Sequence, residues 1–316
     1  MNYTRRFLFV SGCILIITAL QAQDLDFNQY KNLNDAETRL SEYKDSDQML
    51  GLKLAQLEVI NASRKRYKAK PVKLDILASR VANKQSKEAA EGEFRGHWNT
   101  RGEKPYHRYA FAGGVDHVTE NAAATWIQGG TLDGKPETHL KLMTDLHKEF
   151  MAEKKPNDGH KQTIIQKDHN YVGIGCFMTK THFRYYEEFV DRYAEIGEAP
   201  RYVKPGQEFT ISIKPNDGFL YYAVAYYEKV PKAMSSKEVN RKSSYPDYTN
   251  EAAQKHAPWD LAKFRDSTGR YNVPFKLSKK GLYYIQMLVD KKDPAGTNSF
   301  NTEGKTTVTG IVVEVR

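Results

Sequence analysis

The pattern of hydrophobic and polar positions changes once along the chain, near Pro200. Before that point the apolar residues recur at helical spacing. They lie three or four positions apart between residues 48 and 66, and this pattern predicts an amphipathic helix there. A second face of this kind predicts a helix over 73–90. The first face consists of Leu50, Leu54, Leu57 and Ile60, and the second of Leu74, Leu77, Val81 and Ala82.

After Val203, apolar residues alternate with polar ones and turn residues separate the runs. This pattern predicts antiparallel strands, and we expect a small all-β sandwich of the immunoglobulin type. A polar insertion over about 231–270 interrupts it. The alternating positions include Phe209, Ile211, Ile213, Tyr222, Val224, Tyr226, Leu282, Tyr284, Met287, Val289, Val308, Ile311 and Val313.

Shorter elements fill the middle of the first half. Pro136 opens a predicted helix over 136–154, in which Leu146 and Glu153 are seven residues apart and point almost the same way. Glu153 therefore stands at the end of the buried face, where a carboxylate needs a partner. A tight turn then delivers His160 to the start of another short helix, and Pro105 opens a further one.

A strand is predicted over 171–178 and a partner strand over 183–193. Gly173 and Gly175 share one face of the first strand, which allows a helix or loop to approach closely. Ahead of these strands, the residues after Asn121 form a run of three alanines. We expect that run to be helical.

The N-terminus has the pattern of a secretory signal peptide over 1–22, with Arg5 and Arg6 ahead of an apolar run. We expect cleavage near Ala22 and release to the exterior, the periplasm or the cell surface. A lipid anchor at Cys13 is the alternative. Removal of the two arginines would lower the net charge of +9 by two.

Composition narrows the class of protein. Charged residues make up 28% and hydrophobic residues 40%, so the chain can form packed cores. Of the two cysteines only Cys176 would remain after cleavage, which excludes an internal disulfide. The basic run Arg64 to Arg66 is interpreted as a solvated helix end, and export argues against nucleic-acid binding.

Histidine is unevenly distributed. Eight of the nine histidines lie between residues 97 and 182, and histidine serves as a proton carrier or metal ligand near neutral pH. We expect Thr119-Glu120-Asn121 and Asp158-Gly159-His160 to meet His97 around one polar cleft. The eight are His97, His107, His117, His139, His147, His160, His169 and His182.

Nucleophilic catalysis is disfavoured. No serine occurs between Ser86 and Ser212, so the predicted cleft has no serine of its own. Cys176 lies on the apolar face of a predicted strand, where desolvation makes a thiol inert. The sequence also has no glycine-rich phosphate loop and no zinc-protease helix motif.

Five phrases in a fixed order resemble the bacterial branch of the CAP superfamily, also called the SCP or cysteine-rich secretory, antigen 5 and pathogenesis-related family. The resemblance covers about 48–195 and implies a three-layer α-β-α sandwich, so the expected fold class is α+β. The phrases are Ile60 to Arg64, Gly96-His97, Glu120-Asn121, Gly159-His160-Lys161 with Ile164, and Val172 to Gly175.

The resemblance also implies a cleft with two histidines and two acids, which in some members holds a divalent cation such as zinc. His97 and His160 match the family histidines and are the implied metal ligands. Glu120 matches the acid of the family's Gly-Glu-Asn phrase, and Glu153 is placed by its helix and its nearness to His160. Two imidazoles with carboxylates suit zinc and could equally act as general acid and base.

We therefore expect a CAP-like domain over 48–197, after a lead-in segment over 23–47, and a β-sandwich-like domain over 203–316. The favoured function is the binding of a divalent cation or a small ligand, including a lipid, in the cleft. The β-domain would serve a cell-surface or protein partner. A zinc-dependent hydrolase using the same cleft is the alternative, and a structural surface protein with an idle cleft is a third hypothesis.

Overall fold

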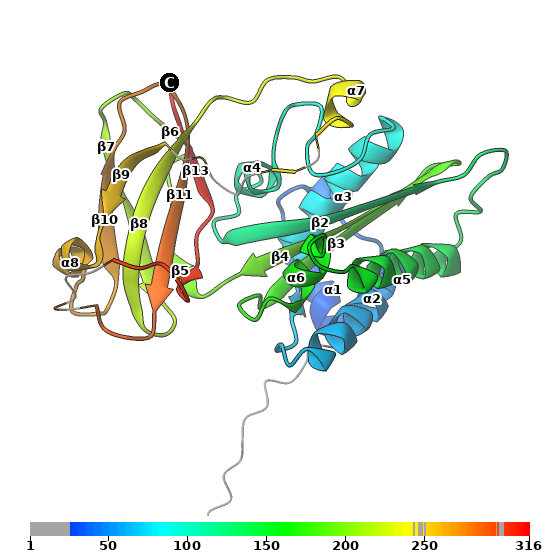
Figure 1. Cartoon of the computed structure of the whole chain (residues 1–316), viewed down its shortest axis with the longest axis horizontal. Helices are drawn as coiled ribbons and strands as arrows, with labels where there is room; N and C mark the ends of the chain where they lie inside the picture. The colour runs from blue at the N-terminus through cyan, green and yellow to red at the C-terminus, as the bar shows by residue number, and fades with distance from the viewer. Residues whose placement is uncertain (1–25, 243, 246–248, 250, 295, 297–299) are drawn as a thin grey trace, which may run out of the picture.

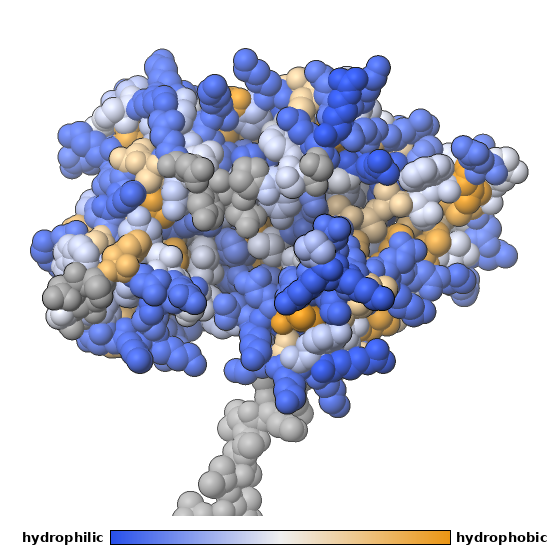
Figure 2. All heavy atoms as spheres, viewed as in Figure 1, coloured by the Kyte–Doolittle hydropathy of each residue, from blue (hydrophilic) through white to orange (hydrophobic). Residues whose placement is uncertain are grey.

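The computed structural model describes residues 26–242, 244–245, 249, 251–294, 296 and 300–316. The chain forms a mixed α/β unit followed by a β-rich unit, which pack side by side (Figure 1). The face shown in Figure 2 is mostly hydrophilic. Within the described part of the chain, no helix has the length and apolar character needed to cross a membrane. The predicted signal peptide and Cys13 lie outside the described residues.

The first unit is built on one four-stranded sheet, in which β2 forms an edge. Its strands follow the order β1-β3-β4-β2, and β4 pairs antiparallel with both β3 and β2. The exposed edge of β2 is where the predicted site residues gather, as described below. The strands are β1 (Lys73–Leu74), β2 (His117–Trp126), β3 (Tyr171–Met178) and β4 (His182–Asp191).

Helices cover both faces of this sheet. α3 and α4 lie on one face, while α2 and α5 pack on the other together with α1 and α6 (Figure 1). This is the expected three-layer arrangement, and the fold class α+β is confirmed. The helices are α1 (Phe27–Ala36), α2 (Asp47–Arg66), α3 (Ile76–Glu91), α4 (Pro105–Phe111), α5 (Pro136–Ala152) and α6 (Gly159–Ile165); a 3-10 turn, η1 (Ser41–Tyr43), precedes α2.

The two glycines of β3 allow the close approach that the sequence predicts. A Cβ atom on Gly173 would come within 2.3 Å of the Ala78 backbone, and one on Gly175 within 2.2 Å of the Ala82 backbone. α3 therefore lies directly on the sheet, and a side chain at either glycine would push it away.

Two local predictions are wrong. The alanine run 122–124 belongs to strand β2, because its backbone pairs with β4. Tertiary pairing here overrides the helix propensity of alanine. The helix expected over 73–90 begins only at Ile76, since Lys73 and Leu74 form β1 and Asp75 caps the helix through its side chain.

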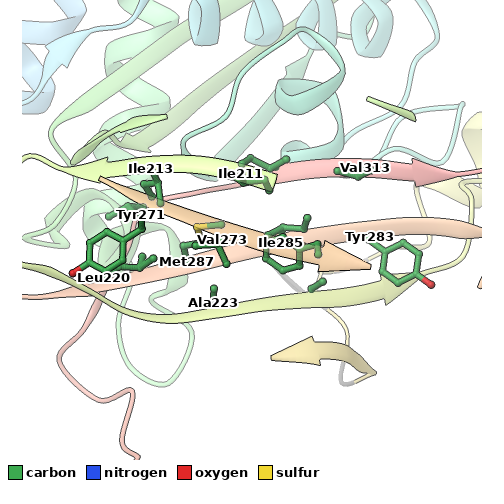
Figure 3. Close-up of a cluster of buried hydrophobic side chains, with 14 of the residues drawn as sticks. Ile211, Ile213, Leu220, Ala223, Tyr271, Val273, Tyr283, Ile285, Met287 and Val313 are labelled. Carbon is green, nitrogen blue, oxygen red and sulfur yellow. The ribbon is translucent and has the colours of Figure 1, made fainter. Parts of the chain in front are cut away.

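The second unit is a β-sandwich in which a three-stranded sheet faces a larger one across an apolar core (Figure 3). Ile211, Val273 and Ile285 lie in that core. The sheets follow the orders β10-β7-β5 and β6-β13-β11-β8-β9, with β12 beside β11. The strands are β5 (Ala194–Ile196), β6 (Tyr202–Val203), β7 (Glu208–Pro215), β8 (Phe219–Glu228), β9 (Ala252–His256), β10 (Tyr271–Lys276), β11 (Gly281–Asp290), β12 (Thr306–Thr307) and β13 (Ile311–Val315).

The two units share a buried contact. Tyr284 of β11 stacks on Tyr106 of α4 with ring centroids 4.2 Å apart, and Leu282 and Val312 join the same cluster. β11 is therefore buried on both faces, one toward the sandwich core and one toward the first unit. This contact accounts for part of the abundance of tyrosine.

The polar insertion contains short elements. They are α7 (Ser236–Val239), β9, α8 (Pro258–Leu261) and a 3-10 turn, η2 (Ala262–Phe264). In Figure 1, α7 lies away from the sandwich, beside the end of α3. The insertion thus reaches back to the first unit.

Candidate functional site

The structure brings the four predicted site residues together at the edge of β2. The His97 and His160 ring centroids are 6.4 Å apart. Each imidazole is bonded through Nδ1 to one carboxylate, His97 to Glu120 at 2.9 Å and His160 to Glu153 at 2.5 Å. Four segments supply them, namely the loop after α3, strand β2, the end of α5 and the start of α6.

Arg108 of α4 positions the His97 half of the site. Its guanidinium donates to the His97 carbonyl at 2.6 Å and forms an ion pair with the Glu120 carboxylate. Gly96 supplies the positive φ of 86° that turns the chain ahead of His97, and its carbonyl accepts from the Tyr186 hydroxyl. The backbone and the side-chain partner of His97 are thus held by one buried cation.

A second carboxyl group lies beside this pair. Glu188 of β4 is directly opposite Glu120 in the sheet, so both side chains lie on the face covered by α3 and α4. Burial, reinforced by the neighbouring Glu120 carboxylate, raises the pKa of Glu188 well above its usual range. Burial opposes the charge of Arg108, but Glu120 and Glu188 raise its pKa above the ordinary value. Burial therefore favours the protonated form of Glu188, while the Glu120 carboxylate is ion-paired with Arg108.

The His160 half is held from the opposite face of the sheet. Asn121, next to Glu120 on β2, donates to the His160 carbonyl at 3.0 Å. The His160 ring stacks on Phe150 at 4.5 Å between centroids. Glu153 is the C-cap residue of α5 and also accepts from the His160 backbone N–H at 3.0 Å. The sequence places Glu153 at the end of a buried helix face, where its carboxylate needs a partner. That partner is His160.

Arg64 anchors the helix that carries His160, and its interpretation as part of a solvated helix end is wrong. Its side chain is fully buried, and the guanidinium donates to backbone carbonyls that would otherwise lack a partner between α2 and α6. Desolvation lowers its pKa to about 10. Lys65 and Arg66 are exposed, as expected. The accepting carbonyls belong to Lys70, Ile164, Gln166 and His169.

The donor set fits a cation with two imidazole ligands. Both Nδ1 atoms are occupied by carboxylates, and no Nε2 of this pair has a hydrogen-bond partner among the described residues. Carboxylates on the distal nitrogen orient metal-binding imidazoles in many proteins. The described residues contain no group of three or more His, Cys, Asp and Glu side chains spaced to hold a metal ion.

The remaining histidines of the cluster lie outside this pair. His107, His117, His147 and His169 are buried, and each is bonded to a carboxylate. Asp191 joins two of them, at 2.8 Å to His117 and 2.6 Å to His169. Burial and a carboxylate partner give these four histidines a structural role.

Sequence reasoning missed one serine. Ser63 of α2 lies 2.9 Å from Nε2 of His147, whose Nδ1 lies 2.7 Å from Glu187. Glu187 also accepts from the Tyr185 hydroxyl at 2.7 Å. Ser63 lies outside the serine-free stretch between Ser86 and Ser212, and only the packing of α2 on α5 brings it to His147. It lies on the face of the sheet opposite Glu120.

Two more residues of the site were missed, Arg108 and Tyr245. Arg108 is four residues after Lys104 in a basic, aromatic run, and nothing in that pattern distinguishes a buried arginine from an exposed one. Tyr245 comes from the insertion of the second unit, and its ring lies 4.7 Å from that of His97. No sequence signal connects positions 97 and 245.

Comparisons with known proteins find similarity to a family in the first unit. The model of the CAP family, the cysteine-rich secretory protein family, matches residues 57–190. No curated protein matches the chain. Among solved structures, an extracellular protein containing an SCP domain from Bacillus anthracis str. Ames is 16% identical with a TM-score of 0.34, and the match covers 44% of this chain and 40% of that one.

An outer surface protein from Borrelia burgdorferi is also 16% identical, with a TM-score of 0.36, over 45% of this chain and 93% of that chain. The match spans less than half the length of the Bacillus protein. The family match lies within the region 48–195 for which the sequence phrases predict it. Residues 57–190 match the CAP family model, so this region of the chain is similar to a CAP domain.

Proposed function

We propose that this CAP-like domain binds a divalent cation, such as zinc, through Nε2 of His97 and Nε2 of His160. The observation that carries the proposal is the facing pair of imidazoles, each with its Nδ1 bonded to a carboxylate. Those carboxylates fix the ring orientation and increase the basicity of the nitrogen that would face the cation. Glu120 and Glu153 thus act as orienting groups behind the ligands.

Such a site leaves coordination positions open. Zinc in proteins commonly takes four ligands, so two imidazoles leave room for water or for a polar group of a small ligand. The His160 side chain is 33% exposed and that of His97 is 16% exposed, so a ligand would enter from the His160 side. A separate cavity of about 540 Å³ beside Trp98, lined by none of the four site residues, has room for a small ligand with an apolar part, including a lipid.

A zinc-dependent hydrolase is the second candidate. The open coordination positions favour it, because the cation could lower the pKa of a water bound there. Catalytic zinc sites commonly have three protein ligands, however, and the described residues offer two at this place. Binding is therefore the better supported function.

Calorimetric titration of zinc into the purified mature protein tests the proposal. We expect one site in the parent, and none in a His97→Ala/His160→Ala variant. A His139→Ala/His182→Ala variant is the matched control, since both histidines lie outside the site. Equal binding by the parent and the His97/His160 variant would refute the proposal.

The hydrolase alternative is tested on the same proteins. Zinc-loaded parent and double variant are screened against ester, peptide and glycan substrates. Turnover by the parent and none by the variant would favour the enzyme, and silence of both would favour the binding module.

We further propose that the protein is exported and that the β-rich unit serves a cell-surface or protein partner. The apolar run after Arg6 supports export. N-terminal sequencing of the protein recovered outside the cytoplasm should begin at Gln23. A lipid-modified N-terminus at Cys13 would instead show the anchored alternative.

A further inference from the structure

Part of the insertion in the second unit lies along the loop that carries His97. We name residues 231–242, 244 and 245 the strap. In Figure 1 its helix α7 lies beside the end of α3, far from the sandwich core. Four hydrogen bonds join the strap to this loop. The Arg95 N–H donates to Asn240 Oδ1 at 2.9 Å, and Asn240 Nδ2–H donates to the Glu93 carbonyl at 3.3 Å. Trp98 Nε1–H donates to the Ser244 carbonyl at 3.1 Å, and the Met234 N–H donates to the Thr100 carbonyl at 2.7 Å.

The strap is also anchored by burial. Val239 at the end of α7 is fully buried against Ala89 and Phe94 of the first unit. Ser235 caps α7 through its side chain and, with Glu238, completes a capping box. A helix this short is not stable alone, so its contacts with the first unit hold the strap in place.

These anchors bring Tyr245 to the site. Its ring lies 4.7 Å from the His97 ring, at an interplanar angle of 60°. The backbone N–H of Glu120 donates to its hydroxyl oxygen at 3.0 Å. That N–H belongs to the free edge of β2, where an unpaired backbone donor would otherwise need water or another strand.

We propose that Tyr245 completes the cation site, so that the site is a composite of both units. The phenol ring covers the His97 half, while the hydroxyl fixes the backbone of Glu120, whose carboxylate orients His97. This inference rests on the proposed cation binding. Tyr245 is a positioning residue that acts on the ligand through His97 and Glu120.

The position of Tyr245 limits which ligands can bind at the edge of β2. An extended peptide adding to the edge of β2 would need the Glu120 N–H, which the Tyr245 hydroxyl already occupies. The strap therefore disfavours the addition of a peptide strand at Glu120 and leaves the more exposed His160 side open.

The shielding of His97 by the Tyr245 ring is tested without metal. Histidines are carbethoxylated with diethyl pyrocarbonate, and the modification of each peptide is measured by mass spectrometry. We expect His97 to react at least about threefold faster in Tyr245→Ala than in the parent, while His160 is unchanged. Tyr245→Phe keeps the ring and should react like the parent. Tyr202→Ala, an exposed tyrosine of the same unit, is the matched control. Equal His97 rates in parent and Tyr245→Ala would overturn the inference, whether or not zinc binds.

The positioning role is tested by zinc titration of the same variants. We expect Tyr245→Ala to bind zinc about tenfold more weakly, as for other residues behind a metal ligand, and Tyr202→Ala to bind like the parent. Faster labelling with unchanged zinc affinity would overturn the positioning role. If the parent does not bind zinc, the proposed function fails and the labelling alone decides whether Tyr245 covers His97.

Discussion

The two halves of the site are built differently. Around His97, the Glu120 side chain is fully buried, Arg108 contributes a buried charge and Tyr245 covers the ring from the second unit. Around His160, Glu153 is 24% exposed, and the supports are the stacked Phe150 ring, the hydrogen bond from Asn121 and the Arg64 guanidinium behind α6. The charge network of the first half has no counterpart among the described residues of the second.

The difference implies that the two halves would respond differently to a bound cation. Buried, charge-assisted contacts fix the His97 half before any ligand arrives. The His160 half depends on a short helix and on a more exposed ion pair, so it can adjust when a cation enters. A site with one fixed and one adjustable ligand can accept cations of different size at a cost in selectivity.

The strongest way to break this comparison is to remove Arg108. Arg108→Met leaves the Glu120 carboxylate buried without its cation, and we expect the free energy of unfolding to fall by about 3–5 kcal/mol. Urea denaturation measures it. Arg101→Met is the control, because that arginine is 41% exposed in its ion pairs and should cost about 1 kcal/mol or less. Equal losses of unfolding free energy in both variants would mean that the buried ion pair of the His97 half contributes no more to stability than an exposed ion pair.

Arg64 tests the other half. Arg64→Met leaves several backbone carbonyls without a donor, and we expect a loss of about 2–3 kcal/mol in the free energy of unfolding. Hydrogen exchange should become faster in α6 than in β2, since the Arg64 guanidinium donates to the Ile164 carbonyl of α6 and, within the described part of the chain, to no carbonyl of β2. Arg66→Met, on the exposed side of the same helix, should change neither quantity. Faster exchange in β2 than in α6 would contradict the independence of the halves.

Glu188→Gln tests how the buried carboxyl group of Glu188, in the His97 half, makes stability depend on pH. The pKa of Glu188 is raised in the folded state, so its contribution to stability is complete below the unfolded value near 4.5 and is lost as pH rises toward the folded pKa. Glutamine mimics the protonated carboxyl and removes that loss. We expect the variant to melt a few degrees above the parent at pH 8 and close to it at pH 4.

Thermal unfolding at both pH values measures this effect. Glu195→Gln, at a side chain that is 69% exposed, should show no such dependence. A Glu188→Gln variant that is less stable than the parent at pH 8 would mean that this carboxyl is charged in the folded protein.

Residue spacing predicted those parts of the fold that local sequence controls. The helical face of α2, the strand β3 and its two glycines follow from periods that need no knowledge of distant residues. The helix prediction for the alanines of β2 was wrong because alanine adopts the structure that its neighbours impose. Here the neighbour is β4, which pairs with them from far along the chain.

The site divides in the same way. His97, Glu120 and His160 were found through short phrases that resemble a family, and Glu153 through helix geometry. Arg64, Arg108 and Tyr245 were not found, because their roles come from burial and long-range contacts that no local pattern records. The domain limits at 197 and 203 stay a prediction.

X-ray absorption spectroscopy of the zinc-loaded protein tests the central claim most directly, since it counts the ligands of the metal. The account predicts two imidazole nitrogens with oxygen ligands from water or a small ligand, and one imidazole fewer in either His97→Ala or His160→Ala. A spectrum with no imidazole, or one unchanged in both single variants, would contradict the assignment of His97 and His160 as a pair of ligands.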